Sequence, residues 1–389
     1  MPKSAERLSN LPPYIFAVLG QRVQAMIAKG VDVISLDIGS PDLPPPQPVI
    51  DTLTQSAQNA NNHGYSGYRG SPAFRQAVAD YYGRRFNVDL DAESEVLPLL
   101  GSKEGIINLC FAYLDRGDAA LVPSISYPSY SIGAQLAGAD VCWISVNTDN
   151  DYQFEIASLA NLAGKAKLLW VNYPNNPTGA VATTDFYSEL VDFCKSHDIL
   201  LVSDNPYVDV TYDGYKAPSI LEIPGAKECA IEFMSCSKTY NMGGWRLGAA
   251  VGNSFALKKL LQVKSNVDSG HFRPIYDAGT VALNETPQDW IDKRNHVYQM
   301  RRDIILEALP SIGLEAQKPK GSLYVWAKVL QGNGTNYVEE ALQEASVALA
   351  PGEAYGPGGE QYIRISLGVS DDKLQNALNR LQQWHLSKI

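Results

Sequence analysis

The chain has 389 residues, of which 45% are hydrophobic and 19% are charged, and its formal net charge is −10. This composition predicts a globular protein of two or three domains, and the acidic balance argues against nucleic acid as a partner. We expect no membrane association, because no uncharged apolar run approaches the ~20 residues of a membrane span.

The cysteines and histidines predict neither cross-links nor a metal site. Five cysteines stand at positions 110, 142, 194, 229 and 236 without any C-x-x-C spacing, and the five histidines are scattered. We therefore expect a reducing compartment and no bound metal. The amino-terminal stretch MPKSAERLSNLPPYIF has no apolar core of signal-peptide length, so the expected location is the cytoplasm.

In chain order, the first predicted element is an amphipathic helix in YIFAVLGQRVQAMIAKG, which Gly30 stops. A short strand, VDVISL, then leads into the proline-dense segment PDLPPPQP, which we interpret as a domain boundary. From about residue 50 to 270, strand patterns alternate with helical patterns such as KEGIINLCFAYL and TDFYSELVDFCKSH. The predicted strands are AALV (119–122), VCWISV (141–146), KLLWV (167–171), ILLVSD (199–204), AIEFMS (230–235) and GAAVG (248–252).

The alternation of strands and helices predicts an α/β fold. Its large domain should contain a mostly parallel sheet covered by helices on both faces. The last hundred or so residues mix charged helices with short strands such as SLYVWAKV and YIRISL, which predicts a smaller α+β domain. The expected division is residues 1–45 as an amino-terminal segment that contributes to the small domain, 46–275 as the large domain, and 276–389 as the small domain.

Unusual polar residues follow the predicted strands where these end. Asp204 ends ILLVSD, Lys238 follows AIEFMS, GSKEG (101–105) follows the leucine run VLPLL, and NYPNNPTG (172–179) follows KLLWV. Each alone has a plain structural explanation as a helix cap, a turn or a surface charge. Because the carboxyl ends of parallel strands lie along one edge, we expect all four to converge on the crevice where such sheets bind ligands.

The chemistry of this set indicates a site for pyridoxal phosphate (PLP). A lysine in a crevice can form a Schiff base with a carbonyl if burial or neighbouring cations lower the pKa of its amine. A phosphate requires N–H groups at a helix start, hydroxyls and a cation, which GSK at 101–103, Ser235, Ser237 and Arg246 provide. An aspartate can hold a proton on a ring nitrogen, and an aromatic side chain can stack on the ring.

The motifs resemble those of the class I/II, fold type I, PLP-dependent aminotransferases over nearly the whole chain. They are YSGYRGSPAFR (65–75), GSKEG (101–105), NYPNNPTG (172–179), SDNPY (203–207), SCSKTYNMGGWRLG (235–248) and YIRISL (362–367). Two departures, Gly243 where many relatives have threonine and Asn205-Pro206 where many have Glu-Ala, involve no residue with an assigned role. The resemblance implies a two-stage amino transfer between an L-amino acid and a 2-oxo acid through a Schiff base on Lys238.

The resemblance also implies a role for each matching residue. Lys238 is implied to shuttle a proton between the substrate Cα and the cofactor C4′. The implied cofactor contacts are Asp204 at the pyridinium nitrogen, Asn176 and Tyr207 at the phenolic oxygen, Tyr127 on the ring face, and Ser102, Lys103, Ser235, Ser237 and Arg246 around the phosphate. The implied substrate contacts are Gly39, Asn176 and Arg364, with Arg364 gripping the α-carboxylate as a bidentate fork. Tyr65 is implied to reach the phosphate of a neighbouring subunit, which implies a homodimer with shared active sites.

The sequence leaves the substrate pair open. Residues 11–46 and the segment KSNVDSGHFRPI (264–275) resemble LL-diaminopimelate aminotransferases and related alanine, aspartate and aromatic aminotransferases. The candidate donors are therefore LL-diaminopimelate, aspartate, alanine and glutamate. Tyr14, Ile15 and His271 are candidate pocket residues, and Tyr355 is a candidate lid residue.

Three alternatives to amino transfer remain. The first is another PLP reaction on the same fold, namely that of a C–S lyase, a decarboxylase or an acyl-transfer synthase; Arg364 and the full motif set favour amino transfer over these. The second is a non-enzymatic PLP-binding sensor, which the absence of a basic amino-terminal helix-turn-helix pattern argues against. The third is a cofactor-free structural protein, which would leave the polar strand ends unexplained.

Overall fold

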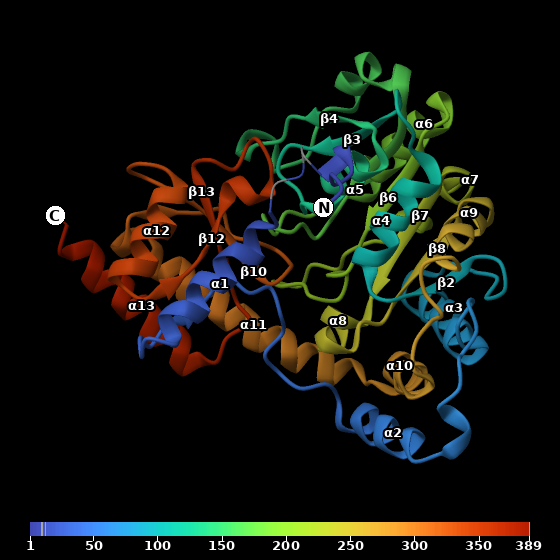
Figure 1. Ribbon diagram of the computed structural model, residues 1–389, viewed down its shortest axis with the longest axis horizontal. Helices are drawn as coiled ribbons and strands as arrows, with labels where there is room; N and C mark the ends of the chain where they lie inside the picture. The colour runs from blue at the N-terminus through green and yellow to red at the C-terminus, as the bar shows by residue number, and fades with distance from the viewer. Residues whose placement is uncertain (9–10, 12, 389) are drawn as a thin grey trace.

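The structure, a computed structural model, describes residues 1–8, 11 and 13–388, and it contains two main sheets with helices around them (Figure 1). The helices are α1 (Ile15–Ile27), α2 (Gln47–Ala57), α3 (Pro72–Phe86), α4 (Ser102–Tyr113), α5 (Ser129–Ala137), α6 (Thr184–His197), α7 (Ala226–Cys229), α8 (Cys236–Thr239), α9 (Ser254–Lys264), α10 (Arg273–Glu285), α11 (Gln288–Ala308), α12 (Gly334–Glu344) and α13 (Asp371–Leu386). The strands are β1 (Ile34–Ser35), β2 (Val96–Leu99), β3 (Ala119–Pro123), β4 (Asp140–Ile144), β5 (Ala166–Val171), β6 (Leu200–Asp204), β7 (Ala230–Ser235), β8 (Gly248–Gly252), β9 (Leu314–Glu315), β10 (Tyr324–Val329), β11 (Val347–Ala348), β12 (Ala350–Pro351) and β13 (Tyr362–Ser366).

The larger sheet has seven strands in the order β2-β8-β7-β6-β5-β3-β4. Strands β4, β3, β5, β6 and β7 pair in parallel, whereas β8 runs antiparallel to both β7 and β2. Leu99 at the end of β2 and Ser235 at the end of β7 both lie opposite Gly248. The carboxyl ends of β2, β5, β6 and β7 therefore lie along one edge, and the predicted α/β fold with a mostly parallel sheet is confirmed.

Helices cover both faces of this sheet, which explains why its strands are nearly continuous apolar runs. Along β5, Leu168 and Trp170 pack with residues of α4, α5 and α9 on one face. Leu169 and Val171 alternate with them and belong to the core on the other face, where α3, α6 and α10 pack. The sheet is thus buried on both faces, and ligands can reach only its edge.

The second sheet is antiparallel, with the order β12-β13-β10-β9, and a short parallel pair joins β1 to β11. Its core includes apolar residues of α11, α12 and α13. The amino-terminal helix α1 packs on this part of the chain, because Leu19 and Val23 contact Leu342 and Ala348. Figure 1 accordingly shows the blue α1 beside the red carboxyl-terminal elements.

The long helix α11 runs from the second sheet toward α8 of the larger one (Figure 1). Near its start, Arg294 donates to the carbonyl oxygens of Lys238 and Thr239, and to that of Asp209 at 2.5 Å. Two turns later, Arg301 binds Asp42 and Asp371, each at 2.7 Å. One helix is therefore bonded to the segment that carries Lys238 and to the surroundings of the second sheet.

Within the described part of the chain, every helix is too short or too polar to cross a membrane.

Candidate active site

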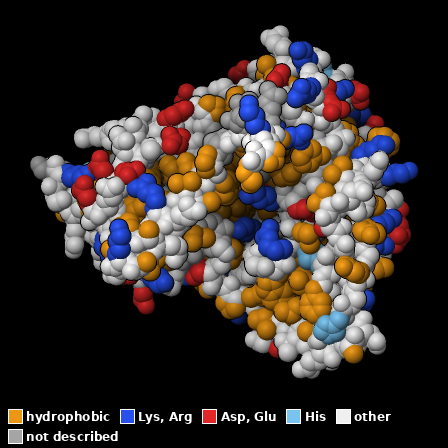
Figure 2. Space-filling view, viewed as in Figure 1, with side chains coloured by type: hydrophobic (Ala, Val, Ile, Leu, Met, Phe, Trp, Pro, Cys, Tyr) orange, Lys and Arg blue, Asp and Glu red, His pale blue; other side chains and the backbone are white. Residues whose placement is uncertain are grey.

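A pocket of about 520 Å³ lies where the carboxyl edge of the seven-stranded sheet faces β10 and β13. Figure 2 shows this hollow at the junction of the two parts of the molecule, with Lys and Arg side chains inside it. The pocket is lined by every residue of the predicted site except Tyr65: Gly39, Ser102, Lys103, Tyr127, Asn176, Asp204, Tyr207, Ser235, Ser237, Lys238, Arg246 and Arg364.

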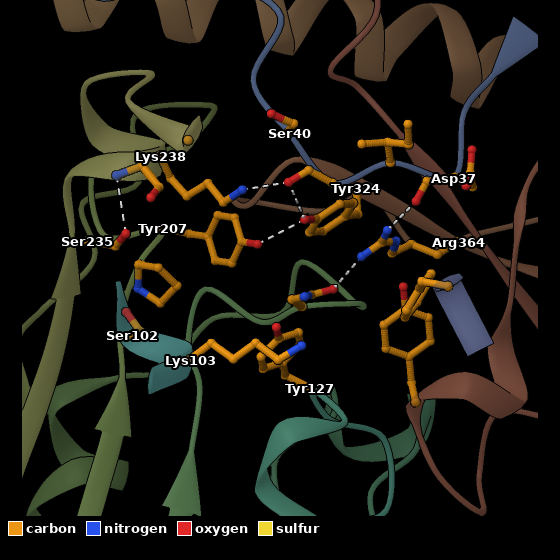
Figure 3. Close-up of a pocket in the computed structure, with 18 of the residues that line it drawn as sticks. Asp37, Ser40, Ser102, Lys103, Tyr127, Tyr207, Ser235, Lys238, Tyr324 and Arg364 are labelled. Atoms are coloured by element: carbon orange, nitrogen blue, oxygen red, sulfur yellow. Dashed lines mark hydrogen bonds between the residues drawn. The ribbon is translucent and has the colours of Figure 1, made fainter. Parts of the chain in front are cut away.

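Lys238 lies in α8, the four-residue helix that directly follows β7. Ser235 caps this helix, since its hydroxyl accepts a hydrogen bond from the Ser237 N–H at 3.2 Å. The Lys238 Nζ donates to the carbonyl oxygen of Gly39 at 2.5 Å (Figure 3). Burial, together with the charges of Arg364 and Arg246, lowers the pKa of the Lys238 amine, although Tyr324 opposes the shift. The amine therefore gives up its proton more readily than an ordinary lysine does.

Asp204 ends β6 and is only 4% exposed. Its Oδ2 accepts a hydrogen bond of 2.7 Å from the Tyr130 hydroxyl, whereas its Oδ1 is buried without a partner. Burial raises the pKa of Asp204 to about 7, and the charge of Glu232 adds to this, while the Tyr130 hydrogen bond lowers it. A buried carboxylate oxygen without a donor fits a protonated ring nitrogen, which would supply both a hydrogen bond and a positive charge.

A second group of polar residues gathers at the amino-terminal end of α4. Gly101 precedes the helix with a φ of +80°, and a Cβ there would lie 2.5 Å from the Arg246 Nη2. The hydroxyl of Ser102 is buried without a partner. Helix amino termini attract anions through free N–H groups and the helix dipole. With the Arg246 guanidinium and the Ser235 hydroxyl also lining the pocket, these groups fit a phosphate.

The Lys103 side chain takes a different direction from the other residues predicted around the phosphate. Its ammonium lies 4.1 Å from the centre of the Tyr14 ring. Figure 3 shows the side chain extending from Ser102 toward Tyr127. The structure thus places the backbone of Lys103 in the first turn of α4, next to Ser102, and its charge near Tyr14 and Tyr127.

Arg364, on β13, forms the opposite wall of the pocket. Its Nη1 donates to the Asn176 Oδ1 at 3.0 Å, and its Nη2 donates to the carbonyl oxygen of Asp37 at 2.6 Å. The guanidinium carbon lies 3.9 Å from the centre of the Tyr324 ring, and Nε is buried without a partner. These contacts hold the guanidinium in one orientation and leave its Nε–H without an acceptor, an arrangement that suits a carboxylate ligand.

Asn176 and Tyr207 stand between the two ends of the pocket. The Asn176 N–H donates to Asn172 Oδ1 at 2.8 Å, and Asn172 Nδ2 donates to the Asp204 carbonyl oxygen at 2.5 Å. The hydroxyls of Tyr207 and Tyr324 are 2.9 Å apart. Asn172 therefore ties the loop after β5 to the end of β6, which places Asn176 beside Asp204.

Other residues named in the sequence analysis fall in different places. Tyr65 is 93% exposed and does not line the pocket. His271 is buried, and its Nε2 makes a 2.7 Å hydrogen bond with the Arg246 carbonyl oxygen. Tyr14 and Tyr355 line the pocket, whereas Ile15 lines a neighbouring groove of about 570 Å³.

Sequence reasoning missed two tyrosines that the structure brings to the site. Tyr130 lies in the first turn of α5, Tyr127 precedes that helix, and their ring centres are 5.8 Å apart. The SYPSY motif that named Tyr127 therefore also contained Tyr130. Tyr324 begins an apolar strand and carries no local signal. Among the residues that the structure describes, no group of three or more His, Cys, Asp or Glu side chains is arranged to hold a metal ion.

Comparison with known proteins bears on the site as a whole. The family model for aminotransferase class I and II matches residues 31–381. The LL-diaminopimelate aminotransferase of Moorella thermoacetica is 46% identical over 383 residues, which cover 98% of each chain. The corresponding enzyme of Aquifex aeolicus is 44% identical over 384 residues, covering 98% of this chain and 99% of the other. Among solved structures, apo-BacF from Bacillus subtilis matches with a TM-score of 0.94 and 33% identity over 98% of each chain.

Proposed function

The chain belongs to the class I and II aminotransferases, and from this we propose that it transfers the amino group of LL-diaminopimelate to a 2-oxo acid. It is a PLP-dependent transferase of the α/β fold type shared by that family. The choice of donor is supported by the 46% identity with the Moorella enzyme over 98% of the chain.

We propose the following cofactor contacts. Bound PLP supplies an aldehyde that takes up the amino group and a ring that withdraws electrons from the substrate Cα. Asp204 would offer its unpartnered Oδ1 to the ring nitrogen, and Tyr127 would lie on the ring face. The remaining contacts would be Asn176 and Tyr207 at the phenolic oxygen, and Ser102, Ser235, Ser237, Arg246 and the Lys103 backbone at the phosphate.

Lys238 is the proposed proton carrier. Its Nζ, made less basic by burial, removes the proton from the substrate Cα and holds it during the exchange. The Gly39 carbonyl oxygen accepts one of its N–H bonds and so directs the nitrogen into the pocket. Arg364 takes the α-carboxylate through Nε and its remaining N–H bonds, which orients the Cα–H bond toward Lys238.

Lys103 provides the structural support for a donor with a second carboxylate. Its ammonium lies on the same side of the pocket as Tyr127 and Tyr14, apart from the phosphate end. LL-diaminopimelate carries a second amino-acid group at its far end, and a lysine at this wall can pair with the carboxylate of that group.

The donor is tested by single-turnover amino transfer with a panel of LL-diaminopimelate, glutamate, aspartate, alanine, an aromatic and a branched amino acid. We expect LL-diaminopimelate to react with the highest kcat/KM. Lys103→Met should raise KM for the dicarboxylic donors by about tenfold, the loss of one charge-assisted hydrogen bond, and leave alanine within about twofold. Lys259→Met is the matched control, since Lys259 lies 5.3 Å from the centre of the Phe255 ring, outside the pocket. The proposed donor would be wrong if the wild-type enzyme did not react with LL-diaminopimelate but reacted with another donor of the panel.

We further propose that the enzyme is a homodimer with shared active sites. Exposed Tyr65 and Tyr68 are on one loop and exposed Phe272 is on another, and the two loops are joined because the Ser66 hydroxyl donates to the His271 carbonyl oxygen at 2.8 Å. Mixing inactive Lys238→Ala chains with Tyr65→Ala chains should restore activity, since each mixed dimer has one site with both residues intact. No recovery in mixtures that light scattering shows to be dimeric would contradict shared sites.

The state of the cysteines supports a proposal about the cellular compartment in which the enzyme acts. All five are free thiols, and three of them are buried. Free thiols are typical of reducing compartments, so we propose that the enzyme acts in the cytoplasm, which cell fractionation would test.

A further inference from the structure

Tyr324 is a buried residue of the pocket wall that the proposed mechanism does not yet use. It is the first residue of β10 and is 1% exposed. In the antiparallel pairing of β10 with β13, Tyr324 lies opposite Ser366 and Trp326 lies opposite Arg364. Tyr324 and Arg364 are thus diagonal neighbours on one face of the sheet, at a separation that aromatic and long side chains bridge.

The ring of Tyr324 supports the Arg364 guanidinium. The guanidinium carbon is 3.9 Å from the centre of this ring, against 5.1 Å for Tyr355 and 5.6 Å for Phe16. Tyr324 is therefore the aromatic residue in closest contact with the cation. A planar guanidinium stacked on a ring keeps its N–H bonds in a fixed plane, which is the requirement for bidentate recognition of a carboxylate.

The hydroxyl of Tyr324 reaches the other end of the pocket. It is 2.9 Å from the Tyr207 hydroxyl and 3.4 Å from the Gly39 carbonyl oxygen, the same oxygen that accepts the Lys238 Nζ–H bond (Figure 3). An added Cβ at Gly39 would collide with this hydroxyl. One phenol therefore lies against Tyr207 and against the carbonyl oxygen that directs Lys238.

The charges around this phenol shift its pKa, and its contact with Gly39 sets the direction of its hydrogen bond with Tyr207. Burial raises the pKa of Tyr324, but the charges of Arg364 and Lys238 and the hydrogen bond with Tyr207 together bring it below its ordinary value. Burial raises the pKa of Tyr207 well above its ordinary value, and the neighbouring Tyr324 adds to this. The Tyr324 O–H donates to the Gly39 carbonyl oxygen, so its oxygen is left to accept the hydrogen bond from Tyr207. The Tyr324 oxygen also favours the protonated form of the nearby lysine nitrogen.

We propose that Tyr324 is a positioning residue for amino transfer: its ring holds Arg364 in the plane that receives the substrate carboxylate, and its hydroxyl fixes Tyr207 and the nitrogen of Lys238. This inference rests on the roles proposed above for Arg364, Tyr207 and Lys238. The ring and the hydroxyl of Tyr324 thus have different tasks, and two substitutions can test them separately.

Tyr324→Phe removes the hydroxyl and keeps the ring, whereas Tyr324→Leu removes both. Tyr337→Phe is the matched control, because Tyr337 belongs to the same hydrophobic core and donates to the Ile312 carbonyl oxygen at 2.9 Å, outside the pocket. Each cofactor-loaded variant is compared with the wild type for its kcat and KM with the best donor of the panel, for its melting temperature, and for the pH at which the visible absorption of bound PLP changes.

We expect Tyr324→Phe to keep KM within about twofold, to lower kcat by about tenfold and to move the absorption midpoint down by about 0.5 to 1 pH unit, the equivalent of one lost hydrogen bond. Tyr324→Leu should show the same midpoint shift and, in addition, a KM raised by about tenfold or more. Tyr337→Phe should change only the melting temperature.

The proposal is overturned if Tyr324→Phe raises KM as much as Tyr324→Leu does, or if its absorption midpoint and kcat equal those of Tyr337→Phe. Tyr324→Phe alone decides the role of the hydroxyl if Tyr324→Leu does not fold. Because the comparison uses whichever donor the wild type accepts, an error in the choice of LL-diaminopimelate leaves this test intact. A wild type that accepts no donor would instead refute the proposed function.

Discussion

Asp204→Asn is expected to make the cofactor-free chain more stable while it impairs the enzyme. The carboxyl of Asp204 is buried, with one oxygen on Tyr130 and the other without a partner. Without a cation beside it, such a group is disfavoured in its charged form. Asparagine has nearly the same shape and no charge, so it removes this penalty and also removes the partner proposed for the ring nitrogen.

The size and sign of the effect follow from the pKa of Asp204. Burial raises it to about 7 in the folded chain, against about 3.9 in the unfolded chain. Below about pH 4 both states hold the proton, and between about pH 4 and 7 the folded chain holds a proton that the unfolded chain has lost, so stability falls as pH rises. A difference of about 3 pH units corresponds to ~4 kcal/mol, an upper value because buried sites relax around a charge.

The assay is urea unfolding of the cofactor-free wild type and variant at fixed protein concentration, at pH 5 and at pH 8. We expect Asp204→Asn to be more stable than the wild type by about 1–4 kcal/mol at pH 8, with a smaller advantage at pH 5. Asp198→Asn, which changes an exposed carboxylate at the end of α6, is the control and should show no such dependence on pH. A variant less stable than the wild type at pH 8, or an advantage equal at both pH values, would refute the reasoning.

Three further substitutions test other parts of the site. Lys238→Ala should lower kcat by at least about 10²- to 10⁴-fold in a coupled assay, because it removes the proposed proton carrier. Its melting temperature should stay within a few degrees of the wild type. Near-normal turnover would exclude Lys238 from that role. Gly101→Ala should weaken PLP binding by tenfold or more in a fluorescence titration, because the methyl group would displace the Arg246 guanidinium and strain a residue with φ of +80°. Tyr130→Phe should raise the pKa of Asp204 further, because it removes the hydrogen bond that lowers this pKa. The pH below which PLP binding weakens should therefore rise by about half a unit or more. An unchanged pH profile of PLP binding would argue against the contact between Tyr130 and Asp204.

The elements that carry the site were predictable from the sequence because their signals are local. Strands such as KLLWV and AIEFMS are mostly apolar, and polar residues mark their ends. The amphipathic helix at the start of the chain was expected to stop at Gly30 and ends at Ile27. The direction of β8 was not predictable, because GAAVG reads the same in a parallel or an antiparallel pairing, and only the register with β2 and β7 reveals it.

The parts of the site that escaped prediction depend on contacts between distant segments. Tyr324 and Arg364 are 40 residues apart, and only the pairing of β10 with β13 brings them together. The direction of the Lys103 side chain depends on Tyr14, which comes from the amino-terminal segment. A sequence motif names a residue but cannot say which way a flexible side chain points, since that is decided by the surface that it meets.

Helix α11 connects the two parts of the enzyme through one continuous element. Arg294 and Arg301 are seven residues apart, or about 10 Å along the helix axis, and a helix transmits displacement over that length with little bending. Arg294 holds the carbonyl oxygens of Lys238 and Thr239, while Arg301 holds Asp42 and Asp371. We therefore expect a swing of the carboxyl-terminal part about the large sheet to pull on the backbone of Lys238, so that a tilt of α11 changes the distance between the proposed proton carrier and Arg364.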